Sequence, residues 1–566
     1  MINLPLTSTS YRKRTDVYIP GLSTRPLNRG AACLPCRKLK ARCDGNKPAC
    51  ARCVANGRPD DCEYAVGGEV TRSRLLEENV ALLEARIREL ENPNETSPSV
   101  RLHDPRRQDA PAAGSSRGAA PIAPNTQTLV PGIPQLASPG SYAAPAQQEA
   151  QTLVQTFMAH ASQLGLFMNP TRFMRAASLP RGAPGCLDDA LMNAVYLWGS
   201  RLSSSNTLRG RETYFSANAV QAAAAGCTLT PQPGMPVPNH VLYSVQTAVL
   251  LANYFLSAGR FLEGKYHWLA AVALVTGSKL HQLDIVALVG ARMDPISIGE
   301  RVHAFWTVFA LDKAWSAAMN GPPSICQRGR AGILVTTPWP LATEAYEQGT
   351  ILPSRGYNYS IHDFVRGAPI DESADDFSRL AIHAKAAALY ESALYVSSQY
   401  RHDMPNRSEF LAQFTALDTH IEGFHRLLAG IRNRGADDMR ELLTARTLVC
   451  VAAIQLHSAF AAQQSTSRQK SLGVAIAAAR ALDLVDLNQY RHLDSVVAML
   501  WGTVARALLE EIRRLIQSAA PVRQEDVARI TTSLDRVMGA MGSLVYNSPL
   551  MATQLTEIQQ ARASLN

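Results

Sequence analysis

The sequence predicts a chain in three parts: a small metal-stabilised module, a short parallel coiled coil and a large all-α domain. Three observations support this division of the 566 residues. Six of the ten cysteines lie between residues 33 and 62, and leucines recur every seven residues from 76 to 90. From about residue 148, apolar residues recur at the three- and four-residue spacing of helices.

The first part is organised by its cysteines, which follow the spacing C-x2-C-x6-C-x6-C-x2-C-x8-C. The pattern is nearly two copies of one half, a C-x2-C pair followed by a third cysteine, and this is typical of metal ligands. Two separate tetrahedral zinc sites need eight thiolates, so with six present two thiolates have to bridge. The repeat indicates that the first cysteine of each half is the bridge, namely Cys33 and Cys50. The predicted ligands of two Zn²⁺ ions are Cys33, Cys36, Cys43, Cys50, Cys53 and Cys62.

Metal binding also has to supply the folding free energy of this part. About thirty residues cannot bury enough apolar surface to fold alone, whereas zinc binding supplies on the order of 10 kcal/mol or more. Two zinc ions with six thiolates carry a net negative charge, which basic residues between the ligands would offset. These residues are Arg37, Lys38, Lys40, Arg42, Lys47 and Arg52.

The segment resembles the DNA-binding module of the fungal binuclear zinc cluster transcription factors. The resemblance rests on the pattern C-x2-C-R-x-x-K-x-x-C-D with a later proline, matched by Arg37, Lys40, Cys43, Asp44 and Pro48. It implies that a short helix after the second cysteine enters the DNA major groove, where Lys40 reads guanine, usually in a CGG triplet. Leu39 occupies a position that is often basic in the family. The predicted DNA-contacting residues are Lys40, Arg37, Lys38, Arg42 and Arg52.

The spacing of the cysteines allows two other interpretations. A disulfide framework needs an oxidising compartment, and the N-terminus shows no apolar signal-peptide core. A zinc module that contacts RNA or protein rather than duplex DNA is the more serious alternative.

Positive charge is concentrated towards the N-terminus. Residues 1–75 hold fourteen Lys and Arg against six Asp and Glu, which is nearly all of the net charge of +9. This distribution is typical of a segment that binds a polyanion. The run Arg12-Lys13-Arg14, with the basic residues after Cys36, indicates nuclear import and hence a nuclear protein. Residues 1–30 are expected to be disordered.

Residues 66–92 are predicted to contain a linker and a dimerising coiled coil. With the leucines at position d, valine and isoleucine occupy position a, which favours a parallel two-stranded coil and a homodimer. The predicted dimerisation residues are Leu76, Val80, Leu83, Ile87 and Leu90. A single amphipathic helix that packs on its own chain is the alternative. Residues 93–147, rich in Pro, Ala and Ser, are predicted to be a disordered linker.

Residues 148–546 are predicted to form the all-α domain, with residues 547–566 as a C-terminal tail. Residues 320–373, rich in Pro and Gly, are expected to wrap over the helices as a long loop. No uninterrupted apolar run reaches transmembrane length, so no membrane partner is expected. The expected helices are 149–165, 188–203, 240–258, 261–281, 298–319, 375–401, 407–434, 437–464, 473–484, 493–516 and 524–546.

Two stretches of this domain resemble the regulatory "middle homology" region of the same family. They are residues 255–281 and residues 300–312 with the following Gly321-Pro-Pro-Ser324, and they centre on Trp306 and Asp312. The resemblance implies a fungal-specific regulatory domain, for which a small-molecule effector or a co-regulator is a candidate partner.

No enzyme motif is complete in the sequence. Gly259 to Tyr266 nearly spells a phosphate-binding loop, but Tyr266 replaces the final Ser or Thr, so a turn between packed helices is expected. His267, His281 and His303 are isolated, and we interpret them as packed core or boundary residues. The remaining cysteines are interpreted as ordinary thiols: Cys186, Cys227, Cys326 and Cys450.

The sequence thus predicts a non-enzymatic, sequence-specific DNA-binding transcription regulator of the RNA polymerase II type. Its zinc cluster is expected to read CGG-like triplets in double-stranded DNA as a dimer. The alternative is a helical small-molecule-binding or enzymatic domain that carries a zinc module for localisation.

Overall fold

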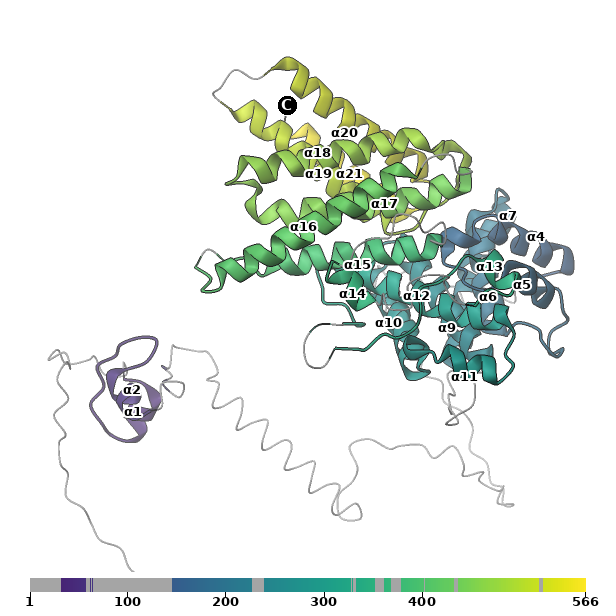
Figure 1. The fold of residues 1–566 in the computed structure, drawn as a ribbon, viewed down its shortest axis with the longest axis horizontal. Coiled ribbons are helices and arrows are strands. Elements are labelled where there is room, and N and C mark those ends of the chain that lie inside the picture. Colours follow the sequence, from purple (N-terminus) through teal and green to yellow (C-terminus); the bar gives the residue numbers. More distant parts are fainter. Residues whose placement is uncertain are drawn as a thin grey trace, which may run out of the picture. The chain divides into compact units, whose positions relative to one another are not determined.

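The computed structural model divides the chain into two compact units, Met1–Pro131 and Gly132–Asn566, which are drawn in Figure 1 and described separately here. In the part of the chain that the structure describes, all regular elements are helices, which confirms the largely helical class. Residues 1–31, the predicted coil 73–92 and most of the predicted linker lie outside the described residues. The described residues are 32–57, 62, 64, 145–225, 239–326, 328, 332–351, 361–367, 378–401, 403–431, 436–518 and 523–565.

The described residues of the first unit, 32–57, 62 and 64, are called the cysteine module. It contains two five-residue helices, α1 (Leu34–Lys38) and α2 (Ala51–Ala55). Its buried core consists of Cys33, Cys36, Cys50, Cys53 and Cys62. Leu39 and Val54 are exposed and Leu34 is half-buried, so within these residues sulfur takes the place of an aliphatic core.

The second unit, called the helical body, contains the other helices of the described residues. Side-chain caps start several of them: Asp188, Asp294 and Ser378 each accept a hydrogen bond from a backbone N–H in the first turn. Its longer helices are α4 (Gln147–Met158), α5 (Pro170–Ala177), α6 (Asp189–Leu202), α8 (Glu212–Ala225), α9 (Asn239–Ser257), α10 (Phe261–Gly277), α12 (Pro295–Ala318), α15 (Arg379–Ser398), α16 (Arg407–Gly430), α17 (Ala436–Ala461), α18 (Ser465–Ala481), α19 (Val497–Gln517), α20 (Gln524–Leu544) and α21 (Pro549–Ala563).

Shorter helices connect these elements. They are η1 (Ala161–Leu164), α7 (Asn206–Arg209), η2 (Leu280–Gln282), α11 (Ile285–Gly290), α13 (Thr343–Glu347), α14 (Ile361–Val365), η3 (Leu482–Leu484) and η4 (Leu487–Gln489).

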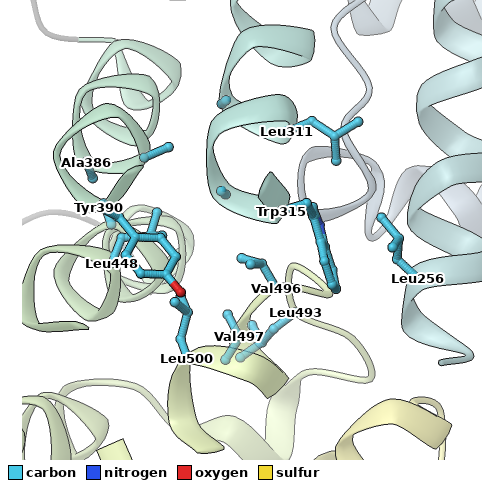
Figure 2. Close-up of a cluster of buried hydrophobic side chains, with 14 of the residues drawn as sticks. Leu256, Leu311, Trp315, Ala386, Tyr390, Leu448, Leu493, Val496, Val497 and Leu500 are labelled. Atoms are coloured by element: carbon cyan, nitrogen blue, oxygen red, sulfur yellow. The ribbon is translucent and has the colours of Figure 1, made fainter. Parts of the chain in front are cut away.

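Helix α15 connects the helices that precede it in the helical body with those that follow it. It packs against α12 on one side and α17 on the other, and α17 in turn packs against α18 (Figure 1). One continuous hydrophobic core runs through these helices and includes the fully buried Trp198, Trp306, Trp315 and Trp501. Figure 2 shows part of it, where side chains from α12, α15, α17 and the start of α19 converge.

A glycine sets the closest approach between two of these helices. A Cβ on Gly199 of α6 would lie 2.3 Å from the carbonyl oxygen of Leu153 on α4. Only glycine therefore lets these two backbones pack so tightly.

The described parts of residues 320–373 lie on the helices, as expected for a wrapping loop. Ile325, Val335, Leu341 and Tyr346 are buried, and α13 packs against α12. The short helices α13 and α14 were not expected within this stretch.

The predicted C-terminal tail was wrong, because residues 549–563 form helix α21 and bury Leu550, Met551 and Ile558. The sequence Asn547-Ser548-Pro549 resembles the end of a helix, but it also begins one. Ser548 caps the N-terminus of α21, and Pro549 suits the first turn. Helices α5 and α8 were not predicted either, and α18 begins at Ser465 rather than at residue 473.

One helix segment, Leu442–Ala461 in α17, is long and apolar enough to cross a membrane. However, 83% of its most apolar window is buried inside the protein, as is usual for a core helix.

Candidate metal centre and nucleic-acid interface

The cysteine sulfurs form two overlapping groups of four. Within each group all sulfur atoms lie within 4.8 Å of one another. The groups share Cys33 and Cys50, which is the pair that the internal repeat predicted as the bridge. The first group adds Cys36 and Cys43, and the second adds Cys53 and Cys62.

The sulfur spacing fits tetrahedral zinc. A Zn–S bond of about 2.3 Å places the sulfurs of a tetrahedron about 3.8 Å apart. The Sγ atoms of Cys33 and Cys50 lie 3.7 Å apart, and Cys33 Sγ lies 3.8 Å from the Sγ atoms of Cys43 and Cys53. These residues could therefore hold two zinc ions without rearrangement.

Each half of the repeat folds in the same way. Cys33 and Cys50 are the N-cap residues of α1 and α2, and each carbonyl accepts the first helical hydrogen bond, from Arg37 N and Val54 N. The second cysteine of each C-x2-C pair then lies within the first helical turn, so both thiols of the pair point towards the same centre.

Polar contacts join the two halves. The carboxylate of Asp44, next to Cys43 of the first half, accepts from the backbone N–H of Ala51 in the second half at 3.1 Å. Within the second half, Cys62 Sγ accepts from Cys50 N at 3.1 Å. The hydroxyl of Tyr64 donates to Asn46 O at 2.8 Å. The contact between Asp44 and Ala51 explains why the motif carries an aspartate. Nothing in the sequence singled out Tyr64.

Lys40 ends α1 in a left-handed backbone conformation with φ of 49°. Its N–H donates to Arg37 O at 3.2 Å, and Ala41 N donates to Cys36 O at 2.9 Å. These two bonds define a Schellman motif, in which the left-handed residue is usually glycine. A lysine costs about 1 kcal/mol there, and its exposed side chain extends from the helix end.

The other predicted DNA-contacting residues lie in α1, directly after it, or in α2. Arg37, Arg42 and Arg52 are exposed, and the side chain of Lys38 lies outside the described residues. Leu39, beside Lys40, is also exposed, at 70%. Among the predicted DNA-contacting residues, the described ones are therefore three exposed arginines and one exposed lysine.

Residues 31–67 match the family model described as the fungal Zn(2)-Cys(6) binuclear cluster domain. The cysteine module is a fungal binuclear zinc cluster domain. Domains of this family bind two zinc ions, and the six clustered cysteines of the zinc cluster domain suit that cofactor.

Three curated relatives are named as transcription factors. The chain is 28% identical over 207 residues to transcription factor FBD3 of Gibberella moniliformis, a match that covers 33% of the chain and 27% of that protein. It is 36% identical over 63 residues to transcription factor FBD3 of Fusarium pseudograminearum, which covers 11% of the chain and 8% of the relative.

The third relative is transcription factor rglT of Emericella nidulans, with 37% identity over 76 residues, 13% of the chain and 17% of the relative. The matches thus span at most 27% of the relatives' own length. No solved structure matches the chain. Together, the zinc cluster domain and these relatives support a DNA-binding transcription regulator, and the middle homology domain stays a prediction.

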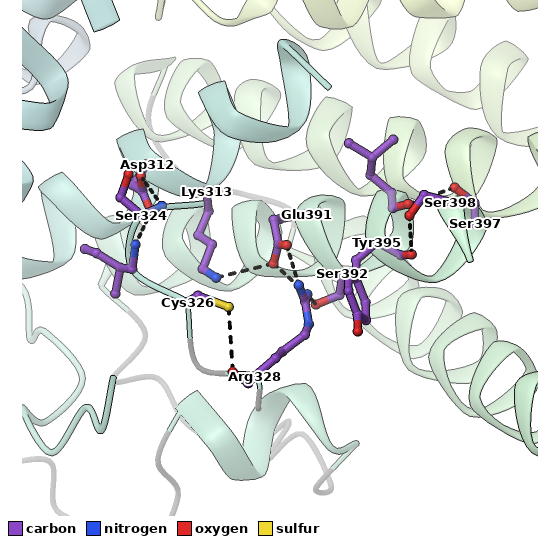
Figure 3. A network of polar contacts seen from close by, with 12 residues as sticks. Asp312, Lys313, Ser324, Cys326, Arg328, Glu391, Ser392, Tyr395, Ser397 and Ser398 are labelled. Carbon is purple, nitrogen blue, oxygen red and sulfur yellow. Dashed lines mark hydrogen bonds and ion pairs between the residues drawn. The ribbon is translucent and has the colours of Figure 1, made fainter. Parts of the chain in front are cut away.

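The stretches that resemble the middle homology region meet at Asp312 in the helical body. Its fully buried carboxylate accepts from Trp268 Nε1 at 2.9 Å, from Ser324 N at 3.0 Å and from Ile325 N at 2.8 Å. Figure 3 shows Asp312 beside Ser324. Burial raises the pKa of Asp312, although these three donors favour its charged form. Asp312 therefore ties α10 and the Gly-Pro-Pro segment to α12.

An adjacent ion cluster joins the same segment to α15. Glu391 accepts from Lys313 Nζ at 3.3 Å and from both terminal nitrogens of Arg328 at 2.6 Å (Figure 3). Burial lowers the pKa of Lys313, while Glu391 counteracts that shift. A bidentate arginine on a buried carboxylate fixes geometry as well as charge.

In the helical body, His457 lies between a serine and an aspartate, as the histidine of a catalytic triad does. His457 Nδ1 lies 3.1 Å from Ser467 Oγ, and His457 Nε2 lies 3.1 Å from Asp418 Oδ1. However, Ser467 is only 4% exposed, and Asp418 also pairs with Lys470 at 2.5 Å. The arrangement links α16, α17 and α18 and leaves the serine without access to a substrate.

The other sequence features have structural roles, as predicted. Gly259, with φ of 74°, forms the turn between α9 and α10, in place of a phosphate-binding loop. His267 is buried against Phe255 with ring centroids 5.4 Å apart, and His303 Nε2 lies 2.8 Å from Leu341 O. Among the described residues Cys186, Cys326 and Cys450 are free thiols; Cys227 lies outside them.

Proposed function

We propose that this protein is a nuclear, sequence-specific transcription regulator that reads CGG-like triplets through its zinc cluster domain. The family of the domain and the names of the three relatives support this assignment. The observation that carries it is Lys40, an exposed lysine at the end of a helix that begins at the metal-binding cysteines.

The zinc ligands follow from the two sulfur groups. One zinc ion is held by Cys33, Cys36, Cys43 and Cys50, and the other by Cys33, Cys50, Cys53 and Cys62. The metal cross-links the two helical halves, and the chain supplies the thiolates and the Asp44 contact that orient α2.

The DNA contacts divide into two kinds. Lys40, exposed in the residues that follow α1, donates to guanine O6 and N7 in the major groove. Arg37, Lys38, Arg42 and Arg52 neutralise phosphates, which adds affinity without sequence preference.

The protein binds its site as a homodimer through a coiled coil. The proposed contacts are the a and d residues from Leu76 to Leu90, which lie outside the described residues. A coil of three heptads is near the lower limit of independent stability, so two adjacent half-sites on DNA promote the dimer. The helical body tunes this activity in response to an effector or a co-regulator.

The division of DNA contacts is tested with the full-length chain on a duplex with two CGG triplets and on a scrambled duplex. Lys40→Ala should cost about 1 to 3 kcal/mol on the CGG duplex and little on the scrambled one. The control Arg42→Ala removes an exposed cation nearby, and should weaken both complexes alike and reduce the salt dependence of binding. Equal losses for Lys40→Ala on every sequence would show that this lysine does not read bases.

Dimer formation is tested by Leu83→Pro, because proline breaks a helix interior. The variant should lose affinity for a two-triplet duplex far more than for a one-triplet duplex, since avidity is lost while each zinc cluster remains. A wild-type protein with equal affinities for both duplexes would be a monomer on DNA.

A further inference from the structure

The helical body contains a cavity of about 380 Å³. Its lining comes from segments far apart in the sequence: residues 161–171, α9, α12, the region around α13, the start of α15 and residues 494–496. The volume lies within the range of about 300 to 1,000 Å³ that is usual for small-molecule sites.

The inner wall of the cavity is apolar. Val249 of α9, Leu311 and Ala314 of α12, and Val496 before α19 all line it and are buried. Figure 2 shows Leu311, Trp315 and Val496, three lining residues, within the hydrophobic cluster that borders it. An apolar ligand body would therefore replace solvent with hydrocarbon contacts.

Two lining residues carry polar atoms that lack a partner within the described part of the chain. They are Oδ1 of Asn253 and Nε1 of Trp315, on side chains that are nine-tenths or more buried. The amide of Asn253 is oriented, because its Nδ2 donates to Leu164 O at 3.0 Å and leaves Oδ1 as an acceptor. A ligand hydroxyl or amide group that reached either buried atom would supply the donor that Asn253 Oδ1 lacks or the acceptor that Trp315 Nε1 lacks.

Charged side chains at the cavity are mainly acidic. Glu344, Glu347 and Asp494 line it, against a single arginine, Arg379. Burial lowers the pKa of His303, which therefore adds little positive charge. His383 Nε2 lies 3.8 Å from Asp494 Oδ2, so this histidine faces a carboxylate. An anionic ligand would meet this excess of carboxylates unfavourably.

We propose that this cavity is a binding site for a neutral small molecule with an apolar body and one hydroxyl or amide group. Such a ligand pairs with Asn253 Oδ1 or Trp315 Nε1, and it connects α9, α12 and α15 with residues 494–496. The inference rests on the proposed function for the regulatory role of this ligand, whereas ligand binding itself is measured without DNA.

The test uses the full-length protein and the fluorescence of N-phenyl-1-naphthylamine, a neutral aromatic amine. Saturable binding of one probe per chain is expected. The matched probe 8-anilinonaphthalene-1-sulfonate has the same aromatic body and a negative charge, and it should bind at least tenfold more weakly. In competition, 2-naphthol should displace the neutral probe at a concentration at least tenfold lower than 2-methylnaphthalene, which lacks the hydroxyl.

Variants locate the bound probe. Thr307→Phe fills the cavity from a half-buried position on α12 and should weaken probe binding at least tenfold. Thr276→Phe, at a half-buried threonine of α10 outside the lining, is the matched control and should bind normally. Thr171→Trp, at an exposed lining position on α5, provides a second block that does not depend on core packing.

The proposal is overturned if no saturable binding occurs, if the sulfonated probe binds as well as the neutral one, or if the folded Thr171→Trp variant retains full binding. It is also overturned if 2-naphthol and 2-methylnaphthalene compete equally. Failure of DNA binding leaves each of these results unchanged, so the two proposals are tested independently.

Discussion

The zinc cluster domain and the helical body differ in what fills their interiors. The described core of the domain consists of cysteine side chains, whereas the body buries tryptophan, phenylalanine and aliphatic residues in one continuous cluster. The domain is too short for a hydrophobic core and needs metal bonds, which are few and strong. The body depends instead on many weak contacts, so its stability is distributed over many residues.

The two regions can be observed separately in the intact chain. All six tryptophans lie in the helical body, at positions 198, 268, 306, 315, 339 and 501. Tryptophan fluorescence therefore reports on the body alone, while released zinc reports on the domain.

Chelation should unfold the zinc cluster domain and leave the body intact. Removal of two zinc ions per chain withdraws on the order of 10 kcal/mol or more from the domain. The thermal midpoint followed by tryptophan fluorescence should stay the same, while DNA binding is lost. Release of one zinc per chain, or a fall in the tryptophan midpoint, would contradict this separation.

Asp312→Ala should destabilise the body without zinc loss. The substitution leaves Trp268 Nε1 and the N–H group of Ile325 buried without their acceptor, at a cost of about 1 to 3 kcal/mol for each of these two groups. The N–H group of Ser324 loses the same acceptor, but Ser324 is exposed. The control Asp526→Ala removes an exposed aspartate that pairs with Arg529 and should change stability by less than about 1 kcal/mol. Equal effects of the two substitutions would show that the Asp312 network is not a structural anchor.

The body should lose stability in mild acid. Burial lowers the pKa of His267 to about 4 from an ordinary value of 6.5, so the unfolded chain binds the proton more tightly. Stability from this group is complete above about pH 6.5 and falls as pH decreases towards 4, by on the order of 3 kcal/mol.

The measurement is the tryptophan-monitored midpoint between pH 7 and pH 4. His267→Phe keeps an aromatic ring against Phe255 and removes the titrating group, so it should flatten this profile. An unchanged profile in the variant would assign the acid sensitivity to other groups, such as His492, whose pKa burial lowers to about 3.

Lys40→Gly should stabilise the zinc cluster domain slightly and still weaken specific DNA binding, by about the 1 to 3 kcal/mol expected for loss of the lysine side chain. Glycine relieves a left-handed backbone at a cost of about 1 kcal/mol for lysine. Lys279, with φ of 58° after α10, has the same conformation in the body, and Lys279→Gly is the matched control. Both substitutions should raise the stability of their own region, but only Lys40→Gly should affect DNA binding. Loss of DNA binding in both variants would remove the special role of Lys40.

Features that depend on local spacing could be predicted from the amino-acid sequence. Six cysteines at short separations predict the metal module, because ligands a few residues apart reach one ion whatever surrounds them. Apolar residues at helical spacing likewise predict a helical body, since this period reflects one face of a helix. The turn at Gly259 and the packed histidines followed from the same local rules.

The tertiary structure decided what depends on residues far apart in the chain. The sequence marked Lys40 and Asp312, but neither the left-handed end of α1 nor the meeting of Trp268, Asp312 and Ile325 can be deduced from spacing. Helix α21 was missed because the signal that ends one helix there also begins the next. The cavity is lined by segments more than three hundred residues apart, and only the packing of the whole body brings its apolar wall and unpartnered polar atoms together.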